Sequence, residues 1–109
     1  MYLNLGNKKI DIIVANSFFQ RFKGLMGKKE ISFGMLFPKT NSIHTFFMKD
    51  DIDVIALDEN NKIINKYENV KKNKIIRINN KIKNTSILEL PKNASKNFKI
   101  NQKLTFISK

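Results

Sequence analysis

The sequence predicts a mainly β protein, a compact antiparallel β-barrel or sandwich of about eight short strands with one or two short helices. Short runs of β-branched and aromatic residues recur along the chain, and turn-type residues follow each of them. Helical spacing is rare, which excludes a doubly wound parallel fold because that fold needs a helix between strands. The 109 residues are 41% hydrophobic, with 16 Ile and 9 Phe, and no shift in composition divides them. We therefore expect residues 1–109 to form a single domain.

The first half of the chain is expected to contain a hairpin, a helix and three further strands. Residues 2–5 and 9–15 flank Gly6, and their β-branched runs predict the hairpin. A polar cap and apolar side chains at helical spacing predict a helix over residues 18–27. The three strands are predicted over residues 34–37, 42–48 and 53–57.

The second half is expected to contain three strands. Residues 58–61, Asp-Glu-Asn-Asn, predict a turn that leads into a strand over residues 62–70. Residues 85–90 form an apolar run that predicts another strand, and residues 103–108 predict the last one. Between these two strands, residues 92–99 are expected to make one or two helical turns.

The charge balance is strongly basic, with a formal net charge of +12 and a sequence pI of about 10.0. Of the 21 basic residues 19 are Lys, and AT-rich codons produce such a composition without selection for a polyanionic partner. Residues 66–84 form a basic segment in which Glu68 is the only acidic residue and Tyr67 the only aromatic one. Because arginine is scarce, we expect nonspecific attraction to anionic surfaces and no sequence-specific binding of nucleic acid.

Several chemistries lack the residues that they need. There is no Cys, which excludes disulfides, zinc ribbons and thiol nucleophiles. The phosphate-binding and dinucleotide-binding glycine motifs and the Gly-x-Ser-x-Gly nucleophile motif are absent, so we expect no cofactor. No run of about 18 apolar residues predicts a membrane span. The N-terminal residues lack the order of a signal peptide, so as written the chain is expected in the cytoplasm.

The single histidine lies in a predicted strand, where alternation places His44, Phe46 and Met48 on one face. Together with Met26 and Met35, their soft donors would suit Cu(I). A lone histidine among Met and Phe is more typical of a core or pocket residue, so we expect no metal site.

Carboxylates follow the histidine closely in sequence. Asp50 and Asp51 lie in the predicted turn and Asp53 begins the next strand, so a carboxylate could meet His44 in an acid–base or salt-bridge cluster. The alternative is that the first two are solvated turn residues and Asp53 pins a strand edge. Glu89 lies inside an apolar run, where it either faces water or is buried with a cationic partner such as Arg21.

Four ordered blocks of residues carry a family resemblance. They are Arg21 with Gly24-Leu25-Met26, Gly34-Met35-Leu36-Phe37, His44-Thr45-Phe46-Phe47-Met48, and Ile52-Asp53-Val54. The series resembles the pattern of the domain of unknown function 192 family, and the likeness continues through Asp58, residues 87–90 and residues 100–106. The resemblance implies a compact single domain rich in β structure and without an established activity.

The resemblance also bears on location and on the turns. Many relatives look like envelope proteins, so it allows an envelope location for this chain. The chain departs from the family pattern mainly in turns: it has Phe47 where many relatives have Trp, Asn61 and Lys92 where Gly is common, and Asn101-Gln102 in place of Gly-Asp. These departures leave the site pattern intact.

The family pattern, with the histidine added, gives a set of candidate site residues. The residues expected to bind a ligand are Arg21, Met26, Met35, His44, Met48, Asp53 and Glu89. Polar residues embedded between apolar blocks need partners or a ligand. These residues therefore form either a buried structural network or a pocket in which Arg21 holds a carboxylate, phosphate or sugar group.

Three functions are compatible with this sequence. The first is a noncatalytic ligand- or partner-binding module for a small polar or anionic ligand, with its pocket near the predicted helix and the His44–Asp53 region. The second is a small acid–base enzyme acting on a polar or glycan-like substrate, with His44 paired to Asp53 or Glu89, so that the sequence leaves catalysis open. The third is an electrostatic binder of anionic surfaces through Lys66–Lys83. The sequence does not determine the oligomeric state.

Overall fold

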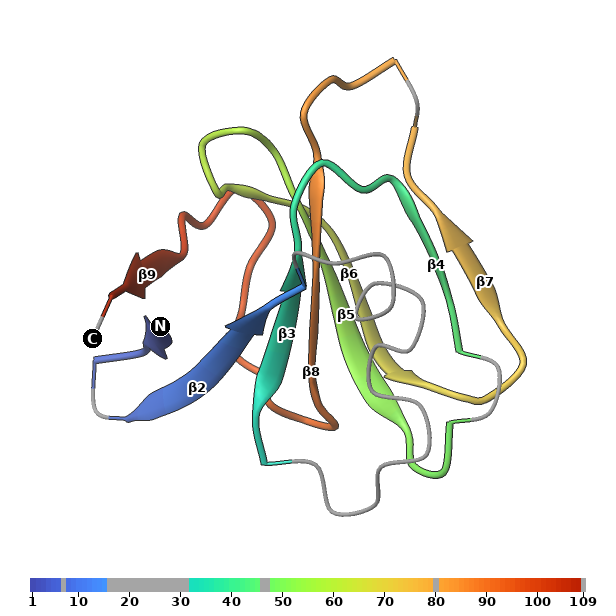
Figure 1. Ribbon diagram of the computed structural model, residues 1–109, viewed down its shortest axis with the longest axis horizontal. Helices are drawn as coiled ribbons and strands as arrows, with labels where there is room; N and C mark the ends of the chain where they lie inside the picture. The colour runs from blue at the N-terminus through green and yellow to red at the C-terminus, as the bar shows by residue number, and fades with distance from the viewer. Residues whose placement is uncertain (7, 16–31, 46–47, 80, 109) are drawn as a thin grey trace.

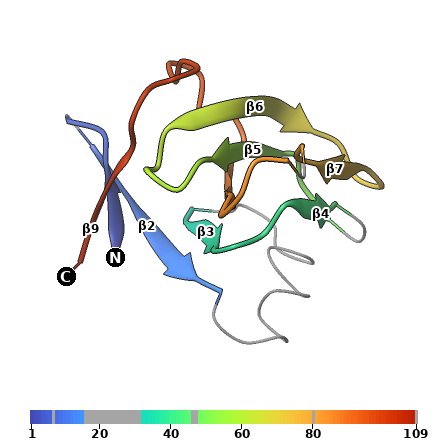
Figure 2. The same cartoon turned by 90° about the horizontal axis from the view of Figure 1, so that it is seen from above.

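A computed structural model of the protein describes residues 1–6, 8–15, 32–45, 48–79 and 81–108. In these residues nine strands form a curved seven-stranded sheet, which is half of a barrel, and a separate two-stranded sheet (Figures 1 and 2). The strands are β1 (Tyr2–Asn4), β2 (Lys9–Val14), β3 (Gly34–Phe37), β4 (Ser42–His44), β5 (Ile52–Leu57), β6 (Ile63–Val70), β7 (Ile75–Arg77), β8 (Ser86–Pro91) and β9 (Thr105–Ile107). The prediction of a mainly β protein is confirmed.

The seven-stranded sheet is mixed, with the strand order β6-β5-β8-β3-β2-β1-β9. Its neighbouring strands are antiparallel except β2 and β3, which run parallel with Ile12 opposite Gly34. A parallel pair needs a long connection, and residues 15–33 connect these two strands. The prediction of an antiparallel barrel or sandwich is confirmed for the other strand pairs of this sheet and does not hold at this pair, because no local feature of either strand sets their relative direction.

Hydrogen bonds between distant parts of the chain support the curvature of the sheet. The segment that precedes β9 runs beside the start of β6, where Ile63 donates its N–H to the carbonyl of Gln102 at 2.9 Å. The carbonyl of Ile63 accepts from the N–H of Asn101 at 2.8 Å, and Leu104 donates to the carbonyl of Asn61 at 2.9 Å. These bonds link the chain next to β9 with β6, at the opposite end of the strand order.

Each face of the seven-stranded sheet carries an apolar cluster. On one face, Met35 and Val54 pack in a cluster that includes Ile76 of the two-stranded sheet. On the other face, Ile55 packs in a cluster that includes Phe98 from the segment between β8 and β9. All six residues of β5 are buried, because this strand lies between β6 and β8 and contributes side chains to both clusters.

Gly34 lies at the start of β3, where three strands approach closely. A Cβ atom at this position would lie 2.7 Å from Cδ1 of Ile12, 2.7 Å from Cδ2 of Leu90 and 3.0 Å from the carbonyl oxygen of Glu89. The absence of a side chain at Gly34 therefore lets β2, β3 and β8 pack together.

Among the described residues other than glycine, most of those with a left-handed backbone conformation are asparagines. Among the described residues other than Gly, positive φ angles between 50° and 74° occur at Lys39, Asn61, Asn69, Asn73, Asn84, Asn93 and Asn101. Asparagine tolerates this conformation better than most residues, because its short polar side chain can form hydrogen bonds with the local backbone.

Several predicted elements differ from the observed ones. The segment 92–99 forms successive turns instead of helical turns, closed for example by the hydrogen bond from the N–H of Phe98 to the carbonyl of Ser95. The strand predicted over 42–48 ends at His44, because the backbone of the next residue turns to bond with residues 73 and 74. The predicted helix over 18–27 lies outside the described residues, and β7 was not predicted at all.

Candidate functional site

Thr45 connects the segment after β4 to the segment between β6 and β7. Its side chain is fully buried. The hydroxyl donates to the carbonyl of Lys71 at 2.7 Å and accepts from the N–H of Lys74 at 2.8 Å. The backbone N–H of Thr45 also donates to the carbonyl of Lys74 at 2.8 Å. One residue therefore holds two segments together that are distant in sequence.

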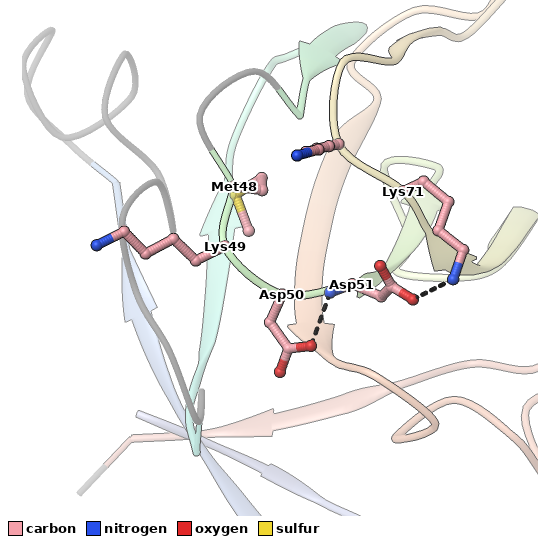
Figure 3. A pocket seen from close by; sticks show the side chains of 6 residues that line it. Met48, Lys49, Asp50, Asp51 and Lys71 are labelled. Atoms are coloured by element: carbon pink, nitrogen blue, oxygen red, sulfur yellow. Dashed lines mark hydrogen bonds and ion pairs between the residues drawn. The ribbon is translucent and has the colours of Figure 1, made fainter.

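A cavity of about 510 Å³ opens where these two segments continue, and we call it the Met48 cavity. Its lining from the described residues is Met48, Lys49, Asp50, Asp51, Lys71 and Lys72. The side chain of Met48 is buried and belongs to the apolar cluster around Val54. Lys49 and Lys71 extend to opposite sides of the segment 48–51 (Figure 3). The cavity thus has an apolar wall and a charged rim, the usual composition of a small-molecule site.

The two carboxylates of the rim each have a lysine partner. Asp51 accepts from Lys71 at 2.6 Å, as the dashed line in Figure 3 shows, and Asp50 accepts from Lys92 at 3.2 Å. The hydrogen bond from Lys92 is the main reason why the pKa of the Asp50 carboxyl lies below its ordinary value of 3.8. Desolvation opposes this effect, and the N–H of Asp51 and the charge of Lys92 lower the pKa further. No ion pair of Lys72 is found among the described residues, so its charge is available to a ligand.

The pairing of Asp50 can be tested by titration. In the Lys92→Gln variant the pKa of Asp50 should rise towards 3.8, because its main hydrogen-bond donor is lost. In the native protein this pair stabilises the fold at pH values above the ordinary pKa, and the stabilisation disappears as the pH falls through the lowered pKa. The measurement is a carboxyl ¹³C NMR titration, with Lys96→Gln as a control lysine that does not contact Asp50. An Asp50 pKa that is the same in both variants would contradict the assignment.

Asp53 lies on β5 and anchors two other parts of the chain, β6 and the segment after β8. Its side chain is fully buried, and one carboxylate oxygen accepts from the N–H groups of Asn69 at 2.9 Å and Asn93 at 3.2 Å. The other oxygen accepts from the N–H of Ser95 at 2.9 Å and from the hydroxyl of the same residue. Four donors therefore satisfy the buried carboxylate.

Glu89 and Met35 are neighbours on the opposite face of the sheet from Asp53. Glu89 of β8 pairs with Met35 on one side and Val54 on the other, and Met35 and Val54 belong to one apolar cluster. Asp53 pairs with Leu90, which belongs to the other cluster. Because consecutive residues of a strand point to opposite faces, the carboxyl groups of Asp53 and Glu89 do not converge.

The remaining predicted site residues are distributed as follows. His44 ends β4, is partly buried and pairs with Ile75 of β7. Met48 shares an apolar cluster with Met35, but the strand that should have aligned it with His44 and Phe46 ends before it, and Phe46 is outside the described residues. Arg21 and Met26 also lie outside the described residues.

The basic segment contributes less free charge than its composition indicates. Lys66 forms an ion pair with Glu68 at 2.6 Å and donates to the carbonyls of Ser95 at 2.8 Å and Phe98 at 3.0 Å. Lys71 is paired with Asp51. These two lysines, counted in the sequence as part of a basic surface, bind partners within the fold.

Thr45 is the positioning residue that sequence reasoning missed. In the sequence Thr45 is one residue of the family block that begins at His44. A threonine in an apparent strand carries no sign that its hydroxyl joins two loops. Lys92 likewise differs from the glycine of the family pattern, and nothing in the sequence indicates its ion pair with Asp50.

The described ranges contain no group of three or more His, Cys, Asp or Glu residues arranged to hold a metal ion. No helix within them has the length and apolar character to cross a membrane.

Comparison with known proteins identifies relatives by sequence. The profile of the DUF192 family, described as "Uncharacterized ACR", matches residues 1–106. UPF0127 proteins of Thermococcus sibiricus and Thermococcus kodakarensis are 39% and 40% identical to this chain over 57 residues, or 47% of the chain. The matched region is only 37% and 36% of the length of those two relatives.

Two crystal structures share the fold. A protein of unknown function from Novosphingobium aromaticivorans superposes with a TM-score of 0.78 at 15% identity, covering 96% of this chain and 82% of the other. A putative transcription regulator from Sinorhizobium meliloti superposes with a TM-score of 0.77 at 19% identity, covering 95% and 89%. At these identities the likeness concerns the fold alone. With a family profile that spans nearly all of its residues, the chain belongs to the DUF192 (UPF0127) family of uncharacterised proteins.

Proposed function

We propose that this protein is a noncatalytic binding module that holds a small ligand with an anionic group and an apolar part in the Met48 cavity. The observation that carries the proposal is the cavity of about 510 Å³ itself, which combines the buried thioether of Met48 with the ammonium group of Lys72, for which the described residues provide no ion-pair partner. Met48 lies in the region between His44 and Asp53. Lys72 lies in the basic segment, which lines the same cavity. Among the described residues that were predicted to bind a ligand, Met48 lines this cavity.

The charges around the cavity favour an anion over a cation. Asp50 and Asp51 are neutralised by Lys92 and Lys71, whereas Lys72 has no such partner among the described residues. Since Thr45 ties the two walls together, the cavity is held in place before a ligand arrives, which lowers the entropic cost of binding.

The proposal is tested with hexanoate, a carboxylate with an apolar chain. Titration of ¹⁵N-labelled protein should shift the amide signals of residues 48–51 and 71–72 in a saturable way. Lys72→Gln should weaken the affinity about fivefold, since one exposed charge pair contributes about 1 kcal/mol. Lys81→Gln is the matched control, because Lys81 is exposed and does not line the cavity.

Two results would contradict the proposal. If hexanol shifted the same signals equally, the anionic group would play no part. If Lys81→Gln weakened binding as much as Lys72→Gln, the third function, nonspecific attraction to the basic segment, would account for the binding instead.

The acid–base alternative has less support from the arrangement of its residues. Both carboxylate oxygens of Asp53 are occupied by hydrogen bonds, and Asp53 and Glu89 belong to opposite faces of the sheet. A general acid or base must reach the proton that it transfers. This arrangement favours binding over catalysis through Asp53.

A further inference from the structure

A second cavity, of about 370 Å³, lies beside the end of the β1–β9 pair where Asn4 faces Thr105. Its described lining comes from the β1–β2 hairpin and from the segments 93–98 and 102–105, the chain between β8 and β9. None of these residues lines the Met48 cavity. We call it the Phe98 cavity, after the buried aromatic side chain in its lining.

Two charged side chains hold the segment 93–98, which forms one wall of the Phe98 cavity. Asp53 accepts hydrogen bonds from the N–H groups of Asn93 and Ser95. Lys66 donates hydrogen bonds to the carbonyls of Ser95 and Phe98. Hydrogen bonds therefore hold both N–H groups and carbonyl groups of this segment. A site on such a rigid backbone loses little conformational entropy when it binds a ligand.

The lining divides into an apolar floor and a rim of hydrogen-bond donors. The floor consists of Leu5, Ala94, Phe98 and Leu104, which all belong to one apolar cluster. The rim contains three lysines and four carboxamides, namely Lys8, Lys96, Lys103, Asn4, Asn93, Asn97 and Gln102. None of the described lining residues is acidic, and the ion pairs found in the described part of the chain involve none of these three lysines.

Two of the carboxamides are oriented by hydrogen bonds within the chain. The side-chain oxygen of Asn4 accepts from the N–H of Gly6 at 3.0 Å, and that of Gln102 accepts from the N–H of Lys99 at 2.9 Å. With each oxygen held by this bond, the NH₂ group of each side chain can donate to a ligand. Lysine ammonium groups only donate, so the rim offers donors to a ligand rich in acceptor oxygens and negative charge.

We propose that the Phe98 cavity binds a phosphate monoester, with the phosphate at the lysine rim and the organic group over Phe98 and Leu104. The phosphate supplies acceptor oxygens and the negative charge that the described residues do not provide to Lys8, Lys96 and Lys103 in ion pairs. The apolar floor supplies surface for the organic group, which a free phosphate ion would not use.

The test uses phenyl phosphate on the whole protein at a constant ionic strength of about 0.15 M, because the net charge of +12 attracts any anion at low salt. Phenyl phosphate should shift the amide signals of residues 93–98 and 102–105 and bind several-fold more tightly than inorganic phosphate. The double variant Lys96→Gln/Lys103→Gln should weaken the affinity by about tenfold. The double variant Lys81→Gln/Lys83→Gln makes the same change in net charge away from the cavity and should leave the affinity unchanged.

Each other result would overturn the proposal. Equal weakening in both double variants would mean nonspecific attraction. Inorganic phosphate binding as tightly as phenyl phosphate would remove the organic group from the site. Signal shifts at residues 48–51 and 71–72 instead would place the anion in the Met48 cavity, so failure here is distinct from failure of the proposed function.

Discussion

Asp53→Ala is expected to lower the free energy of unfolding by about 3–5 kcal/mol, the largest effect of any single substitution considered for this protein. The alanine variant leaves three N–H groups and one hydroxyl without their acceptor in the interior. Each buried donor that loses its partner costs about 1–3 kcal/mol, and partial rearrangement of the segment around Asn93 reduces the sum. Urea denaturation followed by circular dichroism measures the loss.

Two companion variants keep this prediction decisive. Asp51→Asn removes a carboxylate from a partly exposed ion pair and should change the stability by less than about 1 kcal/mol. Ser95→Ala removes only the hydroxyl donor and should cost about 1–2 kcal/mol, so it remains measurable if Asp53→Ala does not fold. If Asp53→Ala were as stable as Asp51→Asn, Asp53 would not be the anchor described above.

Thr45→Val is expected to lower the free energy of unfolding by about 2–3 kcal/mol and to weaken binding of hexanoate in the Met48 cavity. Valine has nearly the same shape but no hydroxyl, so the carbonyl of Lys71 and the N–H of Lys74 lose their side-chain partner. The segments that carry Met48 and Lys72 are then less firmly joined. Urea denaturation and the amide titration with hexanoate measure the two effects separately.

The controls for Thr45 separate its hydroxyl from its size. Thr45→Ser keeps the hydroxyl and should retain most of the affinity for hexanoate. Thr105→Val makes the same chemical change at an exposed position of β9 and should alter the stability by no more than about 0.5 kcal/mol. A Thr45→Val variant as stable as Thr105→Val would show that the hydroxyl does not hold the two segments.

The strands were predictable where the local pattern determines them. Residues 53–57 are continuously apolar after Asp53, and with Ile52 they form the fully buried strand β5, as expected. β7 was missed because only Ile76 of its three residues is buried and its partner β4 is distant in sequence. The parallel pairing of β2 with β3 was missed for a related reason, since strand direction depends on the whole chain and not on either strand alone.

The candidate site residues stay a prediction, because a sequence shows residue types but not the faces of the sheet on which they lie. The structure shows hydrogen-bond partners for the polar Asp53 and places Met48 in the lining of a cavity. The separation of Asp53 from Glu89 follows from the register of β5 against β8, which pairs Asp53 with Leu90. This register cannot be predicted from the residues of β5 or of β8 alone.

The left-handed asparagines indicate which parts of this fold can change freely during evolution. At Asn61 and Asn101, where the resembling family pattern has glycine, φ is 64° and 74°. A mutation from glycine to asparagine at such a turn exchanges one residue suited to this conformation for another. The loop geometry can therefore persist in a chain with only 4 glycines and 15 asparagines, even as mutational bias alters its amino-acid usage. Gly34 has less freedom, because a Cβ atom there would displace the side-chain ends of Ile12 and Leu90 and lie 3.0 Å from the carbonyl oxygen of Glu89.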